Sequence, residues 1–292
     1  MQKTSITAND GYSIPVYSFG INDNNIKGIV IICHGFGENW AFHKDLAERL
    51  LIDGYASVIF DQRGHGEPPG NVKKWQGIIP SYQCFIDDVI TVTEYVIQTS
   101  PNVPLILFGL SMGGNIAANT ILRIPPEKVM LYSCLVLESP WFKLYNRLNA
   151  FSARLIKILS NIAPNFTVSG GLSSSALSDD VNYYDNNTPE KFYHNRMSMR
   201  MLAGVYDAGV YVIKNANKIS LPTFLAYADK DYIVCNKAIL RFAENAGDNV
   251  VVKEYDSKHV IQNEKKEQFC KDVITFMDSQ TGQLPCCGRY SV

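Results

Sequence analysis

The sequence lacks several features that would direct it to a special class of protein. Its 27 basic and 28 acidic residues give a formal net charge of −1, so no surface for nucleic acid is expected. No stretch approaches the ~18 consecutive apolar residues of a membrane-spanning helix, and the first residues lack the apolar segment of a secretory signal. The seven cysteines are odd in number, and none has CxxC or zinc-finger spacing. We therefore expect a cytoplasmic protein without a metal site and without a nucleic-acid partner.

Short apolar runs indicate a sheet that is buried on both faces. With 292 residues and 46% hydrophobic content, the chain can enclose such a sheet in one large domain. The runs are nearly unbroken, as in parallel strands covered by helices, and lie at residues 29–33, 56–60, 105–108 and 134–137. Two further strands are predicted at residues 223–226 and 250–254. Segments with helical spacing alternate with them, at residues 43–51, 81–98, 112–122, 237–246 and 265–277. This alternation predicts an α/β protein with a mostly parallel central sheet flanked by helices.

The alternation of strand and helix breaks after Pro140 and resumes later in the chain. We therefore divide the chain into a first core segment at 1–140, a cap insertion at 141–200 and a second core segment at 201–292. Residues 144–162 of the cap carry apolar side chains at helical spacing, among them Leu148, Phe151 and Leu155. Two interpretations are open for this face: it packs onto the sheet domain, or it forms a lid over an apolar pocket and also touches lipid surfaces.

The pentapeptide Gly-Leu-Ser-Met-Gly at 109–113 matches the GxSxG pattern of a nucleophile elbow. It follows the predicted strand at 105–108 and opens the predicted helix at 112–122. A sharp strand-to-helix turn strains the backbone at the serine, and the small residues beside it let the two elements pass closely. The turn lifts the hydroxyl above the sheet, at the positive end of the helix. This context, more than the pattern itself, makes Ser111 the candidate nucleophile.

A second glycine-rich turn, His-Gly-Phe-Gly-Glu at 34–38, follows the predicted strand at 29–33. A serine that attacks a carbonyl needs donors for the oxyanion, and backbone N–H groups serve best. We expect one donor from Met112, directly after the nucleophile, and the other from Phe36, whose loop is kept thin by its glycines. The next turn contains His65, which precedes the nucleophile, so we interpret it as a structural residue packed near this loop.

The candidate base must follow the nucleophile in the chain order of this type of site. His194 and His259 are the two histidines after Ser111. His259 lies in a loop between the last predicted strand and the last predicted helix, where a base can reach back to the nucleophile, whereas His194 is expected at the surface or in the cap. Three acids could orient His259, and they are Asp229, Asp231 and Glu138.

These motifs together resemble a known family. HGFGE, DQRGHG, GLSMGG, ADKDYIV and KHV, in this order, are similar to the monoacylglycerol lipases and lysophospholipase-like hydrolases of the α/β-hydrolase fold. The resemblance implies that Ser111, Asp231 and His259 form a catalytic triad, with Phe36 and Met112 as oxyanion donors. It also implies a helical cap insertion. One departure is Pro68-Pro69, where family members usually carry a serine.

The expected function is a serine hydrolase that cleaves carboxylic esters with an apolar acyl chain through an acyl-enzyme on Ser111. A monoacylglycerol or a lysophospholipid is the expected substrate, with Leu148, Phe151 and Leu155 of the cap as substrate contacts. No metal or organic cofactor is expected, and the cap is expected to touch membrane surfaces transiently. The alternatives are a short-chain or aromatic, cinnamoyl-type carboxylesterase and a catalytically silent ligand-binding homologue.

Overall fold

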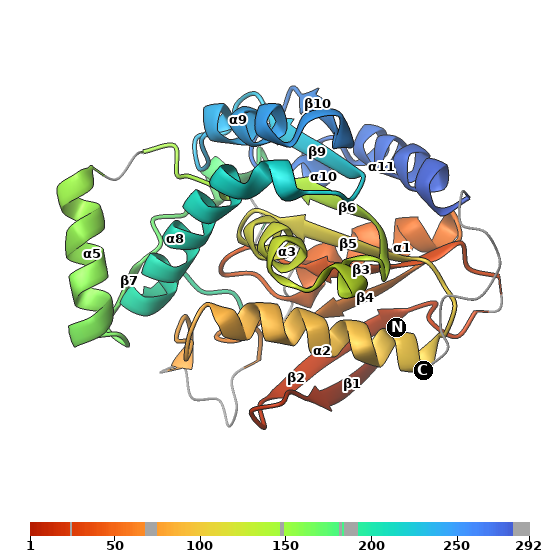
Figure 1. The fold of residues 1–292 in the computed structure, drawn as a ribbon, viewed down its shortest axis with the longest axis horizontal. Helices are drawn as coiled ribbons and strands as arrows, with labels where there is room; N and C mark the ends of the chain where they lie inside the picture. Colours follow the sequence, from red (N-terminus) through yellow and green to blue (C-terminus); the bar gives the residue numbers. More distant parts are fainter. Residues whose placement is uncertain (24, 68–74, 147–148, 181–182, 184–191, 283–292) are drawn as a thin grey trace.

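The computed structural model describes residues 1–292 apart from 24, 68–74, 147–148, 181–182, 184–191 and 283–292. Its described part contains a sheet of eight strands in the order β1-β2-β4-β3-β5-β6-β9-β10, with helices on both faces (Figure 1). Among these strands β2 runs antiparallel to its neighbours and the others run parallel. The mostly parallel sheet that the apolar runs predict is therefore confirmed. The strand bounds are β1 Gln2–Thr7, β2 Ser13–Phe19, β3 Gly28–Cys33, β4 Tyr55–Phe60, β5 Leu105–Leu110, β6 Tyr132–Glu138, β9 Thr223–Ala228 and β10 Val250–Tyr255.

The helices bury the sheet from both sides, which explains the unbroken apolar runs. Every residue of β3, β4 and β5 is buried. One apolar cluster joins the sheet to α2 (Gln83–Thr99), α3 (Met112–Arg123), α8 (Met199–Asn215) and α9 (Asn236–Ala246). A second cluster joins the other face to α1 (Lys44–Ile52) and α11 (Lys266–Thr281). In the part of the chain that the structure describes, no helix is both long enough and apolar enough to cross a bilayer.

The insertion after β6 contains α5 (Ala150–Ile162), α6 (Ser174–Leu177) and a two-stranded ribbon of β7 (Thr167–Ser169) and β8 (Arg196–Ser198). The cap helix is shorter than expected. Leu144 forms an isolated bridge with Val234 instead of joining the helix. The helix begins after Asn149, whose side chain accepts a hydrogen bond from the N–H of Ser152 (2.8 Å) and caps it. α5 stands apart from the sheet and packs against α8 (Figure 1). Leu148 and Pro68-Pro69 lie outside the described residues.

Candidate active site

The turn at Ser111 has the strained geometry of a nucleophile elbow. β5 ends one residue before Ser111 and α3 begins one residue after it, and Ser111 itself has φ 54° and ψ −114°. Such a positive φ is strained for a residue with a side chain. The neighbouring glycines are required sterically: a Cβ on Gly109 would collide with the carbonyl of Gly113, and a Cβ on Gly113 would collide with the carbonyl of Cys33. The serine is therefore held at the sharpest point of the turn.

The two expected oxyanion donors have backbone N–H groups that are available to a ligand. Met112 is the first residue of α3, so its N–H has no carbonyl partner within the helix. Among the described residues, the N–H of Phe36 makes no hydrogen bond to the protein either. The loop of Phe36 follows β3, which pairs with the strand that leads to Ser111. Both donors thus lie at the carboxyl ends of neighbouring parallel strands, where open sheets of this type bind ligands.

His194 lies within residues 141–200, where the cap was expected, but it is buried against the oxyanion loop instead of lying at the surface. Its backbone N–H donates to the carbonyl of Gly37 (3.1 Å), and its Nε2 donates to the carbonyl of Gly64 (2.7 Å). Its ring packs edge-on against Phe36 and tilted against His65, with centroids 5.7 Å and 4.8 Å away. Burial lowers the pKa of His194 to about 4, so the ring is neutral near pH 7. The residue joins the cap to two turns of the core.

His259 and Asp231 form a short buried hydrogen bond. Nδ1 of His259 lies 2.6 Å from Oδ2 of Asp231, and the two side chains are 2% and 0% exposed. The other carboxylate oxygen accepts hydrogen bonds from the N–H groups of Ile233 (2.8 Å) and Val234 (2.9 Å). These bonds fix the carboxylate, which in turn fixes the imidazole and directs its Nε2 away from the acid. Neither Nε2 nor the hydroxyl of Ser111 bonds to another described residue, and such contacts often tighten only when substrate binds.

The two other acids that could have oriented His259 have different partners. Asp229 is exposed and accepts a hydrogen bond from the N–H of Ser257 (3.1 Å). Glu138 is fully buried at the end of β6 and accepts from the N–H of Gln262 (2.8 Å). The described residues include no cluster of three or more His, Cys, Asp or Glu side chains that could hold a metal ion.

The expected substrate contacts of the cap lie on α5 at the surface. The side chains of Phe151 and Leu155 are 76% and 44% exposed, and those of Ile158 and Ile162 are also exposed. These four side chains therefore do not pack onto the sheet domain, although Leu144 packs against the core and α5 contacts α8. The role of Phe151 and Leu155 in binding substrate stays a prediction.

Comparison with known families adds an independent observation. The family described as serine aminopeptidase, S33, matches residues 24–266, which is most of the chain. The chain belongs to this family. Its relatives include a monoacylglycerol lipase of Mycolicibacterium smegmatis, 24% identical over 89% of this chain and 91% of the relative, and a monoglyceride lipase of Mus musculus, 26% identical over 82% and 78%. The resemblance seen in the motifs is therefore confirmed.

Solved structures identify the fold of this S33 family member. A monoglyceride lipase from Saccharomyces cerevisiae in complex with a substrate analog has a TM-score of 0.80 at 21% identity, covering 96% of this chain and 94% of that one. A monoacylglycerol lipase from Paleococcus ferrophilus has a TM-score of 0.79 at 24% identity, covering 92% and 100%. The expected α/β-hydrolase fold is confirmed by these similarities.

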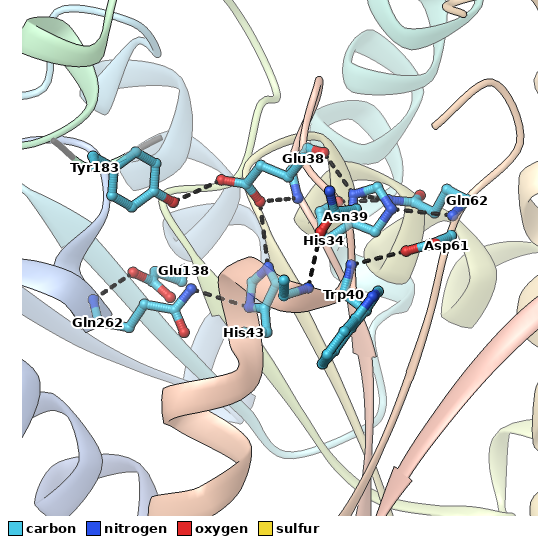
Figure 2. Close-up of polar contacts among 12 residues, drawn as sticks. His34, Glu38, Asn39, Trp40, His43, Asp61, Gln62, Glu138, Tyr183 and Gln262 are labelled. Carbon is cyan, nitrogen blue, oxygen red and sulfur yellow. Dashed lines mark hydrogen bonds and ion pairs between the residues drawn. The ribbon is translucent and has the colours of Figure 1, made fainter. Parts of the chain in front are cut away.

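The S33 chain also contains a buried polar network that sequence reasoning missed (Figure 2). It joins Glu38, His43, Gln262 and Glu138 beside the site, with Tyr183 of the cap at one end. Glu38 is the last residue of the HGFGE motif, which was interpreted only through its glycines and Phe36. No sequence pattern identifies His43 or Gln262 as a functional residue, except that each follows a candidate motif by a few residues.

Proposed function

We propose that the protein is a serine hydrolase of carboxylic esters with an apolar acyl chain, and that its substrate is a monoacylglycerol or a lysophospholipid. The observation that carries the proposal is the strained turn at Ser111 on the same sheet edge as the buried His259–Asp231 pair. Two relatives that match most of the chain, one a monoacylglycerol lipase and the other a monoglyceride lipase, support the ester class.

The proposed reaction has two acyl-transfer steps. His259 takes the proton of the Ser111 hydroxyl while the oxygen attacks the ester carbonyl, and the N–H groups of Phe36 and Met112 stabilise the oxyanion. The C–O bond to the alcohol then breaks, and the imidazolium returns its proton to the leaving alcohol. Water, deprotonated by His259, then attacks the acyl-enzyme. The C–O bond to Ser111 breaks, the imidazolium returns its proton to the serine oxygen, and the acid is released. Asp231 holds the imidazole and stabilises its charged form throughout.

We propose further that residues 141–200 act as the cap over this site, with Leu148, Phe151 and Leu155 in contact with the acyl chain or its membrane source. Phe151, Ile162 and Phe166 are 76%, 76% and 61% exposed, an apolar surface that a lipid surface would cover. Because the proposed substrates are lipids, contact of α5 with a membrane would bring the site to them. Cytoplasmic location is part of the proposal, since the five cysteines in the described ranges are free thiols.

The test measures hydrolysis of a p-nitrophenyl ester series from C2 to C16, of a monoacylglycerol and of a lysophosphatidylcholine. We expect turnover to be faster for esters with acyl chains longer than acetate. In Ser111→Ala turnover should fall by several orders of magnitude, to a residual rate about 10³-fold above the rate in water. Ser279→Ala, an exposed serine on α11, is the matched control and should keep full activity.

Four outcomes would contradict the proposal. Near-normal turnover in folded Ser111→Ala would show that Ser111 is not the nucleophile. Absence of labelling by a fluorophosphonate probe would identify a silent ligand-binding protein. Faster cleavage of aminoacyl anilides than of esters would indicate a peptidase. The fastest hydrolysis at the acetate ester of the series would favour a short-chain carboxylesterase.

A further inference from the structure

The two loops that the proposed reaction needs are far apart in the sheet. The oxyanion loop at 34–38 follows β3, and the loop of His259, here called the base loop, follows β10. Three strands, β5, β6 and β9, lie between β3 and β10. Misplacement of reacting groups by ~1 Å can lower a rate on the order of 10²-fold. Contacts that hold these two loops together therefore bear directly on the reaction.

His43 forms a bridge between the two loops (Figure 2). Its side chain is 0% exposed at the start of α1. Nε2 of His43 lies 3.3 Å from Oε2 of Glu38, and Nδ1 lies 3.0 Å from the amide nitrogen of Gln262. The amide nitrogen can only donate, so Nδ1 accepts and the ring proton stays on Nε2, where it donates to the carboxylate. The imidazole thus uses both of its nitrogens.

Glu38 connects this bridge to the oxyanion loop. Its Oε2 accepts from the backbone N–H of Gly35 (2.7 Å), and its Oε1 accepts from the hydroxyl of Tyr183 (2.9 Å). Gly35 and Glu38 flank Phe36, whose N–H is the proposed oxyanion donor. Burial raises the pKa of Glu38, but the hydrogen bond from His43, the charge interactions with His43 and His34, and the hydrogen bond from Gly35 together leave the pKa below its ordinary value. The carboxylate is therefore ionised, and three donors share its charge.

Gln262 connects the bridge to the other parts of the site. It lies three residues after His259, and its backbone N–H donates to Oε1 of Glu138 (2.8 Å). The backbone carbonyl of Glu138 accepts from the N–H of Ser111 (2.9 Å). The chain of contacts that begins at the oxyanion loop therefore reaches the base loop and the nucleophile elbow.

We propose that His43 is a positioning residue for ester hydrolysis. Its imidazole, held between Glu38 and Gln262, fixes the position of the oxyanion loop relative to the base loop. The proposal rests on the proposed function of the site. His43 acts through Phe36 and His259 and does not touch the substrate. A histidine that only filled the core would affect stability, whereas this one sets the geometry of the transition state.

Four variants separate positioning from packing. His43→Leu and Gln262→Leu each break the bridge and are expected to lower kcat for p-nitrophenyl butyrate on the order of 10-fold to 100-fold, with KM changed by less than about twofold. His43→Gln keeps a donor toward Glu38 and an acceptor toward Gln262, so it should recover most of kcat. The double variant His43→Leu/Gln262→Leu should lose no more than one single variant, because both changes remove the same bridge.

The matched control is Thr93→Val, which removes a buried 2.6 Å hydrogen bond to Tyr132 at the opposite end of β6. It should lower Tm without lowering kcat. A folded Gln262→Leu protein with kcat within about twofold of the unmodified protein would overturn the positioning role, as would losses that multiply in the double variant. Gln262→Leu decides the question even where His43→Leu does not fold. Failure of the proposed function is seen separately, as absence of esterase activity and of fluorophosphonate labelling in the unmodified protein.

Discussion

The carboxyl group of Glu138 gives the sharpest test of the electrostatics beside the site. It is fully buried, its Oε1 accepts from the N–H of Gln262, and its Oε2 has no hydrogen-bond partner among the described residues. Burial, with a smaller contribution from the nearby negative charge of Glu38, raises the pKa of Glu138 from 4.5 to about 8. Glu138 is thus uncharged in the folded protein at neutral pH, while the same group is ionised in the unfolded chain.

This difference makes stability depend on pH with a definite sign. Because the pKa of the folded state lies above that of the unfolded state, the contribution of Glu138 is fully present below pH 4.5. It is lost as pH rises toward about 8, since folding then requires uptake of a proton. Each pKa unit corresponds to about 1.4 kcal/mol, so the total loss is about 4 to 5 kcal/mol. Glu138→Gln cannot ionise and keeps a carbonyl oxygen for Gln262, so it escapes this loss.

The assay is urea denaturation of the unmodified protein and Glu138→Gln at pH 5, 6, 7 and 8. Between pH 5 and pH 8 the free energy of unfolding of the variant should gain about 3 to 4 kcal/mol relative to the unmodified protein. Glu94→Gln, on the exposed side of α2, is the control and should show no such change with pH. Parallel pH profiles for the unmodified protein and Glu138→Gln would show that Glu138 is already ionised in the folded state, which would refute the reasoning.

Two further predictions concern the acid of the triad and the cap. With p-nitrophenyl butyrate as substrate, Asp231→Asn should lower kcat on the order of 10⁴-fold with little change in KM, because the imidazole loses its fixed tautomer. Asp229→Asn is the matched control, and a large loss of kcat in that variant instead would show that Asp229 is the acid that orients His259. Phe151→Asp should weaken co-sedimentation with lipid vesicles and raise KM for long-chain esters, while Tm and acetate hydrolysis stay unchanged because the side chain is 76% exposed. Ile52→Asp, at an 84% exposed position of α1, controls for added charge, and an equal effect of both changes would reject the lipid contact.

The sheet and the elbow could be predicted from the sequence because their signals are local. Strands buried on both faces appear as unbroken apolar runs, and the requirements of the elbow fit within five residues. The choice between Asp229 and Asp231 was harder, since both follow the same strand. The N–H groups that hold the carboxylate of Asp231 come from the two residues Ile233 and Val234, and their convergence is visible only in the folded loop.

Helix α8, at Met199–Asn215, escaped prediction because its stability comes from tertiary packing. Gly204 and Gly209 lie within it, and glycine in a helix interior costs about 1 kcal/mol relative to alanine. The structure explains Gly209, since a Cβ there would collide with the carbonyl of Phe142. Contacts with α3, α5 and α9 offset the low propensity. The bridge between His43 and Gln262 was equally hidden, because the two residues are 219 positions apart.

The location of the buried polar groups is itself an argument for function. The two apolar clusters fill both faces of the sheet, whereas Glu38, His43 and Glu138 gather at the sheet edge that carries Ser111 and His259. Replacing such groups with apolar residues of similar size is often neutral or stabilising, so stability alone does not explain them. If His43→Leu or Glu138→Gln raised stability and kept kcat, the network would serve neither stability nor the reaction. Higher stability combined with a lower kcat in these variants would show that the buried polar groups lower the stability of the protein but position the site for the reaction.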